Sequence, residues 1–143
     1  MAPVPNGVYA IAKPGSQLVT LMEPKDLAVV LPPTGQPGDQ EWQVESRPDD
    51  TVTIKNLRHG TYLTYDSDPN INEMIMGSAE PRPWVLYQAA EPFTFHIVVP
   101  GGPIDGHELA LDLSLLRIFP PRLALRPLEV TDQRLAWKFE FHE

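Results

Sequence analysis

The chain has 143 residues, no cysteine and a formal net charge of −8 at pH 7. This length suits one domain with a core of its own, and the lack of cysteine excludes a disulfide framework, a thiolate metal site and a cysteine nucleophile. The acidic balance argues against a nucleic-acid partner, because affinity for the phosphate backbone depends on clustered Lys and Arg.

The N-terminus has neither the basic nor the apolar segment of a secretory signal, and no apolar run reaches the length of a membrane span. Together with the lack of cysteine, this predicts a soluble cytoplasmic protein without a membrane partner. The 17 prolines occur in clusters that mark loops and strand ends, and no segment shows a helical period. We therefore expect an all-β chain with stiff loops.

The first predicted unit covers about residues 6–48. Alternating apolar residues, separated by turn residues, predict four strands in it, over 7–12, 17–22, 27–31 and 41–46. The fourth strand carries Trp42, which begins a Trp-x-apolar alternation that places two large side chains on one face.

The same order returns in a second unit, about 49–90, and in a third, about 91–143. The predicted strands are 51–56, 61–65, 73–77 and 83–88 in the second unit, and 93–99, 108–113, 123–126 and 136–141 in the third. Trp84 and Trp137 again begin the fourth strands. The tryptophans are 42 and 53 residues apart, so the additional residues of the third unit are expected in surface loops.

Twelve short strands in three similar units predict a closed arrangement, because closure removes free sheet edges. The phrases Gly7-x-Tyr9-x-Ile11, Gln40-x-Trp42-x-Val44 and Ala136-Trp137-x-Phe139 resemble those of β-trefoil proteins. Among these, the chain is most similar to the small cysteine-free protease inhibitors of mushrooms, the mycocypins and their serine-protease-inhibiting relatives. The resemblance implies a single β-trefoil domain over 1–143 and a fungal defence or regulatory inhibitor.

The alternation also predicts which side chains form the core. Besides the three tryptophans, we expect there Tyr9, Ile11, Val44, Ile54, Leu63, Leu86, Phe95, Ile97, Leu111, Leu125 and Phe139.

Signatures of catalysis are missing from the sequence. It has no glycine-rich phosphate loop, no nucleophile elbow and no paired metal-binding histidines. The run from Asp66 to Asn72 begins like a calcium loop, but Ile71 stands where glycine is required and Gly77 where the bidentate Glu belongs. We expect a protein that is not an enzyme and that holds neither a cofactor nor a metal.

An inhibitor of a trypsin-like serine protease needs a stiff exposed loop that presents Lys or Arg to the aspartate of the specificity pocket. Pro24-Lys25-Asp26, between the second and third strands, has this composition. In some mushroom trefoil inhibitors the loop at this place is the reactive one. Lys25 is therefore the first candidate, although an acidic residue such as Asp26 is unfavourable after the scissile bond. We expect a monomer that inhibits a serine protease by inserting this loop.

Two other basic residues are alternative reactive residues. Arg117-Ile118, in the equivalent loop of the third unit, resembles the reactive bond of legume Kunitz-type trefoil inhibitors, whose loop lies between the fourth and fifth strands instead. Arg58 lies in a short hairpin of the second unit. Arg47, at the position of the legume loop, is followed by Pro48 and makes a poor scissile residue.

Two further functions stay open. Inhibition of a papain-like cysteine protease, as in mycocypins, would use the loops 13–17 and 32–39. A ricin-B-like lectin would use an acidic residue, Asp66 or Asp112, beside an aromatic ring, because sugars offer hydroxyls to carboxylates and an apolar face to rings.

Overall fold

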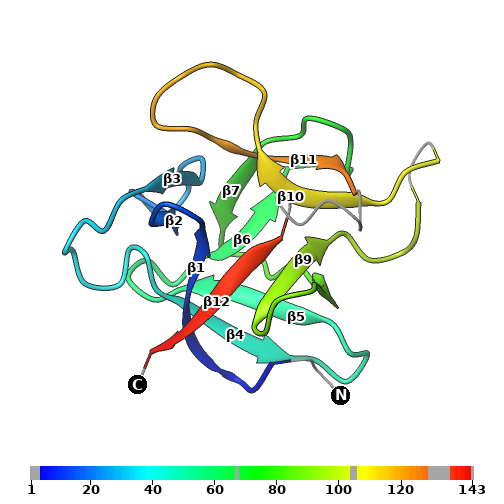
Figure 1. Ribbon diagram of the computed structural model, residues 1–143, viewed down its shortest axis with the longest axis horizontal. Helices are drawn as coiled ribbons and strands as arrows, with labels where there is room; N and C mark the ends of the chain where they lie inside the picture. Colours follow the sequence, from blue (N-terminus) through cyan, green and yellow to red (C-terminus); the bar gives the residue numbers. More distant parts are fainter. Residues whose placement is uncertain (1–3, 67, 104–105, 129–135, 143) are drawn as a thin grey trace.

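The computed structural model describes residues 4–66, 68–103, 106–128 and 136–142, which form twelve strands and no helix (Figure 1). Each predicted strand is present, and its bounds differ from the prediction by a residue or two. The strands are β1 (Gly7–Lys13), β2 (Gln17–Thr20), β3 (Val29–Leu31), β4 (Trp42–Ser46), β5 (Val52–Asn56), β6 (Tyr62–Tyr65), β7 (Ile75–Ser78), β8 (Val85–Gln88), β9 (Thr94–Val98), β10 (Leu109–Leu113), β11 (Leu123–Pro127) and β12 (Trp137–His142).

Six of these strands close into a barrel. Antiparallel pairing joins β12 to β1, β1 to β4, β4 to β5, β8 to β9, and β9 back to β12. The ring is completed between β5 and β8 by a bridge from Val52 to Trp84, whose backbones exchange two hydrogen bonds of 2.8 Å. A closed barrel leaves none of these strands as a free edge.

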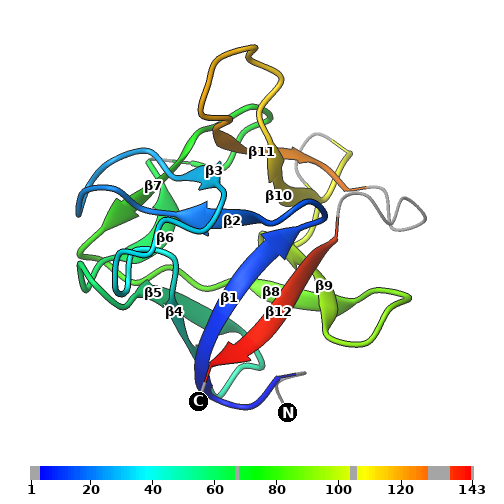
Figure 2. The same ribbon diagram turned by 60° about the vertical axis from the view of Figure 1, so that its left-hand side comes forward.

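The other six strands form three hairpins, β2–β3, β6–β7 and β10–β11, which meet at one end of the barrel (Figures 1 and 2). Each hairpin touches the other two through isolated bridges, Leu27 to Met76, Val29 to Arg122 and Met74 to Ala124. A barrel of six strands capped by three hairpins in pseudo-threefold arrangement is a β-trefoil. The predicted fold is confirmed.

Each tryptophan links a barrel strand to the hairpin of its own repeat. Trp42, Trp84 and Trp137 are fully buried, and each indole Nε1 donates to a backbone carbonyl in the second strand of the repeat at 2.9–3.0 Å. A buried indole N–H requires such a partner, since an unsatisfied donor costs about 1–3 kcal/mol. The tryptophan repeat in the sequence therefore marks a repeated contact between barrel and cap.

The predicted core is also confirmed, because all eleven residues named from the alternation are buried. Aromatic rings fill the barrel beside the tryptophans. Phe139 packs edge-on against Tyr9, with centroids 5.8 Å apart, and against Phe95, with centroids 5.5 Å apart. Burial of this apolar surface is the main stabilising contribution, at about 1.5–3 kcal/mol per large side chain.

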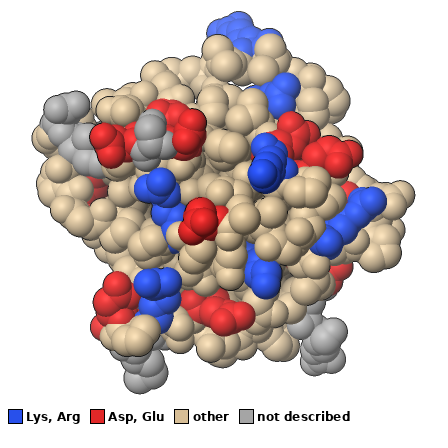
Figure 3. Space-filling model, turned by 180° about the vertical axis from the view of Figure 1, so that it is seen from behind, with Lys and Arg blue, Asp and Glu red and all other residues tan. Residues whose placement is uncertain are grey.

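In the described part of the chain, no helix has the length and apolarity needed to cross a membrane. On the face behind that of Figure 1, acidic and basic side chains are interspersed, and no continuous basic area is visible there among the described residues (Figure 3).

Candidate functional site

The hydrogen bonds of the tryptophans identify equivalent positions in the three repeats. The residue that follows the accepting carbonyl is Thr20, Thr64 or Asp112. In the first repeat the Thr20 hydroxyl accepts a hydrogen bond from Gln40 Nε2 at 3.1 Å. In the second the Thr64 hydroxyl accepts one from Arg82 Nε at 2.8 Å. In these two repeats the threonine hydroxyl is thus bonded to a polar side chain of the same repeat.

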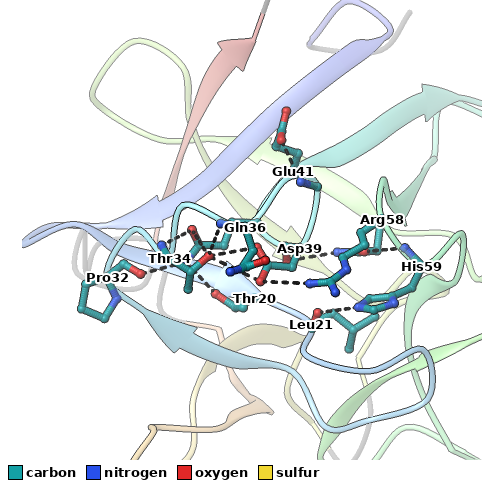
Figure 4. Close-up of polar contacts among 12 residues, drawn as sticks. Thr20, Leu21, Pro32, Thr34, Gln36, Asp39, Glu41, Arg58 and His59 are labelled. Atoms are coloured by element: carbon teal, nitrogen blue, oxygen red, sulfur yellow. Dashed lines mark hydrogen bonds and ion pairs between the residues drawn. The ribbon is translucent and has the colours of Figure 1, made fainter.

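A polar network holds the loop between β3 and β4 (Figure 4). Thr34 donates its hydroxyl to Asp39 at 3.1 Å and its backbone N–H to Gln40 Oε1 at 3.0 Å, and Gln40 Nε2 also donates to Pro32 O at 2.9 Å. Arg58, one of the alternative reactive residues, lies 3.9 Å from the buried Asp39 carboxylate. Its charge is therefore directed toward the loop.

Asp112 pairs with a lysine from the first repeat. Lys13 Nζ lies 3.2 Å from Asp112 Oδ1, donates to Ala136 O at 3.4 Å and sits 4.5 Å from the centre of the Trp137 ring. The Asp112 side chain is only 19% exposed. This carboxylate balances a buried ammonium.

Asp66, the other acidic residue considered for a sugar site, borders a hollow of about 370 Å³ in the second repeat. The Arg82 guanidinium covers the Tyr65 ring there, with Cζ 4.1 Å from the ring centre, and Tyr65 itself is buried. The described lining of this hollow therefore offers no exposed aromatic face to a ligand.

A larger groove, of about 1090 Å³, runs over the outer face of β1 and β12. Ala10 and Ala12 form its floor, where they pair in register with Glu140 and Lys138. Because the side chains of these two alanines are short, the floor lies below the segments on either side of it. One wall is the β1–β2 turn with the loop before β4, and the other is the turn at residues 91–94. Figure 2 shows β1 and β12 side by side.

Phe93 lies at the edge of this groove in an unusual backbone conformation. Its side chain is 58% exposed and its φ is +58°, a left-handed value that is rare for a bulky residue. Hydrogen bonds fix it there, since Phe93 O accepts from Phe139 N at 2.8 Å and Glu91 O accepts from the Thr94 hydroxyl at 2.6 Å. The sequence assigned Phe93 to the start of a strand. That was wrong, because β9 begins at Thr94.

Two carboxylates line the groove together with Phe93. Glu91 comes from the same turn, and Glu140 lies on β12, one residue beyond the strand position that pairs with Phe93. Both are exposed, as is Lys138 on the same strand. The groove thus combines an exposed aromatic ring with hydrogen-bond acceptors.

Lys25, the first candidate for a reactive residue, is exposed at the tip of a tight turn closed by a bond of 3.2 Å from Asp26 N to Glu23 O. The carbonyls on both sides of it are anchored, that of Pro24 by the Thr61 hydroxyl at 2.6 Å and that of Asp26 by Gly77 N at 3.1 Å. A Cβ on Gly77 would overlap the Pro24 carbonyl oxygen, so only glycine permits this approach. The turn displays Lys25 rigidly, in a turned and not an extended backbone.

Arg117 lies on a longer loop, residues 114–122, which projects from the cap in Figure 1. A bond of 2.8 Å from Ser114 N to Arg122 O closes the base of the loop. Arg117 is exposed and so are its apolar neighbours, with Phe119 reaching 83%. Of the two loops considered for a serine protease, this one stands further from the body of the protein.

The loops considered for a papain-like protease, 13–17 and 32–39, come together in the structure. Both contribute to the wall of the groove.

No protein-family model matches the sequence, and no curated protein matches it significantly. Several solved structures are similar to the chain. A ricin B-like lectin of Macrolepiota procera in complex with lactose has 19% identity and a TM-score of 0.78, over 99% of this chain and 100% of that one. The Rhizoctonia solani agglutinin has 19% identity and a TM-score of 0.80, over 99% of each chain. ThreeFoil, a designed three-fold symmetric protein, has 11% identity and a TM-score of 0.77, over 96% and 100%.

At these identities the comparison defines the fold. It supports the β-trefoil part of the resemblance to mushroom inhibitors, while the inhibitor part stays a prediction.

Proposed function

We propose that the protein is a carbohydrate-binding lectin and that the groove over β1 and β12 is its sugar site. The observation that carries the proposal is Phe93, which is 58% exposed and lines a groove of about 1090 Å³ together with the carboxylates Glu91 and Glu140.

The chemistry of the lining suits a sugar. The ring offers a flat apolar surface for the C–H face of a pyranose, and carboxylate oxygens accept hydrogen bonds from its hydroxyls. The shallow floor of Ala10 and Ala12 leaves room above the sheet. The left-handed backbone of Phe93 costs about 1–3 kcal/mol, and such strain clusters at functional sites.

The similar structures add support at the level of the fold. One of them is a ricin B-like lectin bound to lactose, and another is an agglutinin. Since a single fold hosts unrelated functions, the proposal depends on the groove itself.

A glycan array followed by calorimetry tests the proposal. The wild type should bind at least one class of oligosaccharide, and Phe93→Ala should weaken binding at least tenfold, with Glu140→Gln weakening it by a smaller factor. Phe119→Ala removes an even more exposed ring on a loop that does not line the groove and is the matched control. A wild type that binds no glycan, or a Phe93→Ala variant with unchanged affinity, would overturn the proposal.

Inhibition of a trypsin-like serine protease is the second candidate function. The observation that favours it is the projecting loop 114–122, which presents Arg117 beside Ile118 with its base closed by the bond between Ser114 and Arg122. Lys25, flanked by Pro24 and Asp26, is the other residue that could enter the specificity pocket.

Titration of trypsin with the wild type, Arg117→Ala and Lys25→Ala separates these possibilities. A loss of inhibition in Arg117→Ala alone would assign the loop 114–122, and a loss in Lys25→Ala alone would assign the turn. Arg58→Ala completes the set of candidates. A wild type that leaves trypsin fully active at micromolar concentration excludes this function, and a parallel titration of papain tests the loops 13–17 and 32–39.

A further inference from the structure

The groove is larger than a single sugar ring requires. Pockets for drug-sized ligands enclose about 300–1,000 Å³, and this groove encloses about 1090 Å³. Its lining extends from Phe93 on one wall, across the alanine floor, to the loop 33–41 on the other. The groove therefore has room for several sugar units.

Negative charge predominates along the lining. Glu91 and Glu140 line the groove with Phe93, and Glu41 belongs to the opposite wall, where its carboxylate accepts a hydrogen bond of 3.0 Å from Gly38 N. Two lysines belong to the lining as well. One of them, Lys13, is already balanced by Asp112 at 3.2 Å, and Glu41 is bonded within its own loop. This leaves Lys138 beside the two exposed carboxylates Glu91 and Glu140.

This distribution discriminates among sugars by charge. An amino sugar carries an ammonium group, which forms charge-assisted hydrogen bonds with carboxylates, roughly twice as strong as neutral ones. A uronic or sialic acid would bring a like charge to the same carboxylates and be repelled. The walls are exposed to solvent, so each ion pair should contribute only modestly and weaken with added salt.

We infer that the groove binds linear oligosaccharides of amino sugars whose amines are free and charged, in preference to neutral or acidic oligosaccharides of the same length. The inference rests on the proposed sugar-binding function and specifies the ligand of the same site.

Calorimetry with four tetrasaccharides of different charge tests it: glucosamine, N-acetylglucosamine, glucose and galacturonic acid oligomers. At low salt the glucosamine tetramer should bind about 3–10-fold more tightly than the neutral tetramers, as one or two exposed ion pairs would give. The galacturonate tetramer should bind weakest, and the preference should shrink in 0.5 M salt. Affinity should also rise from the glucosamine monomer to the tetramer.

Two variants test whether the preference arises from the carboxylates of the groove or from the net negative charge of the whole protein. Glu140→Gln should reduce the preference for the glucosamine tetramer, whereas Glu45→Gln, an exposed carboxylate of β4 that does not line the groove, should leave it unchanged. Equal losses in both variants would overturn the inference, because attraction to the acidic protein as a whole would then explain the preference.

The remaining outcomes distinguish the inference from the function on which it rests. Neutral tetramers that bind as tightly as the glucosamine tetramer, with Phe93-dependent affinity, overturn the charge preference and leave the lectin proposal standing. A monomer that binds as tightly as the tetramer overturns the requirement for several units. If no oligosaccharide binds, both the inference and the proposed function fail.

Discussion

Lys13 and Asp112 connect the first repeat to the third through a salt bridge of 3.2 Å. In the first two repeats the position equivalent to Asp112 is a threonine that bonds to a residue of its own repeat, Gln40 or Arg82. The third repeat instead receives its partner from β1, the first strand of the chain. The bridge therefore joins a barrel strand of the first repeat to the cap hairpin of the third.

Loss of Lys13 should destabilise the protein more than loss of the whole pair. Removing one partner of a buried ion pair costs about 3–5 kcal/mol, and the 19% exposure of Asp112 places the expected cost of Lys13→Met nearer 2–3 kcal/mol. Asp112→Leu in addition should recover much of this loss, because no unpaired charge remains. Urea unfolding of the single and double variants measures both effects, and additive losses would show that the two side chains are not coupled.

The three tryptophans should make similar contributions to stability. Each is fully buried and donates to one carbonyl in the cap, so replacement by Phe leaves a cavity and an unpaired acceptor in every case. We expect a loss of about 2–4 kcal/mol for Trp42→Phe, Trp84→Phe and Trp137→Phe alike. Thermal and urea unfolding of the three variants provides the test. A variant with a loss below 1 kcal/mol would contradict the equivalence of the repeats.

Alkaline pH should destabilise the fold through Tyr9. Burial raises the pKa of this phenol, whose hydroxyl donates to Pro5 O at 2.6 Å. A group whose pKa is raised by folding contributes its stability below the unfolded value, about 10, and loses it as pH rises further. The urea midpoint should therefore fall above pH 10, and less steeply in Tyr9→Phe.

A second tyrosine acts in the same direction and needs a control. The hydrogen bond from Tyr87 to Glu108, 2.8 Å long, and burial raise the pKa of Tyr87. The Tyr87→Phe variant measures its share of the alkaline loss. If Tyr9→Phe and the wild type respond to pH identically, Tyr9 does not contribute.

The fold could be predicted because its determinants are local. Alternation assigns a face to each strand residue, prolines and glycines mark the turns, and each Trp-x-apolar phrase recurs at the same place in a repeat. The hydrogen bond from Trp42 Nε1 to Val19 O recurs at the same place in each repeat, as the sequence pattern does.

The groove could not be predicted in the same way, because distant segments form it. Ala10, Phe93 and Glu140 come from distant parts of the chain and meet only when β12 pairs with β1 on one side and with β9 on the other. A positive φ at Phe93 has no sequence signature, since the alternation simply extends the strand back to it. The pairing of Lys13 with Asp112 is equally non-local. The one available signal was Glu91-Pro92, which indicates a turn just before the strand.

The backbone of Phe93 leads to a test in which stability and binding change in opposite directions. Its φ of +58° is unfavourable for any residue with a Cβ, by about 1 kcal/mol relative to glycine. Phe93→Gly should therefore be about 1 kcal/mol more stable than Phe93→Ala, while both lose oligosaccharide binding because both lack the ring. Urea unfolding compares the two variants with each other. Because both lack the ring, the loss of ring contacts cancels in the difference between their free energies of unfolding. If the alanine variant proves the more stable one, the left-handed conformation is not maintained in solution, and the strain does not indicate a binding role for Phe93.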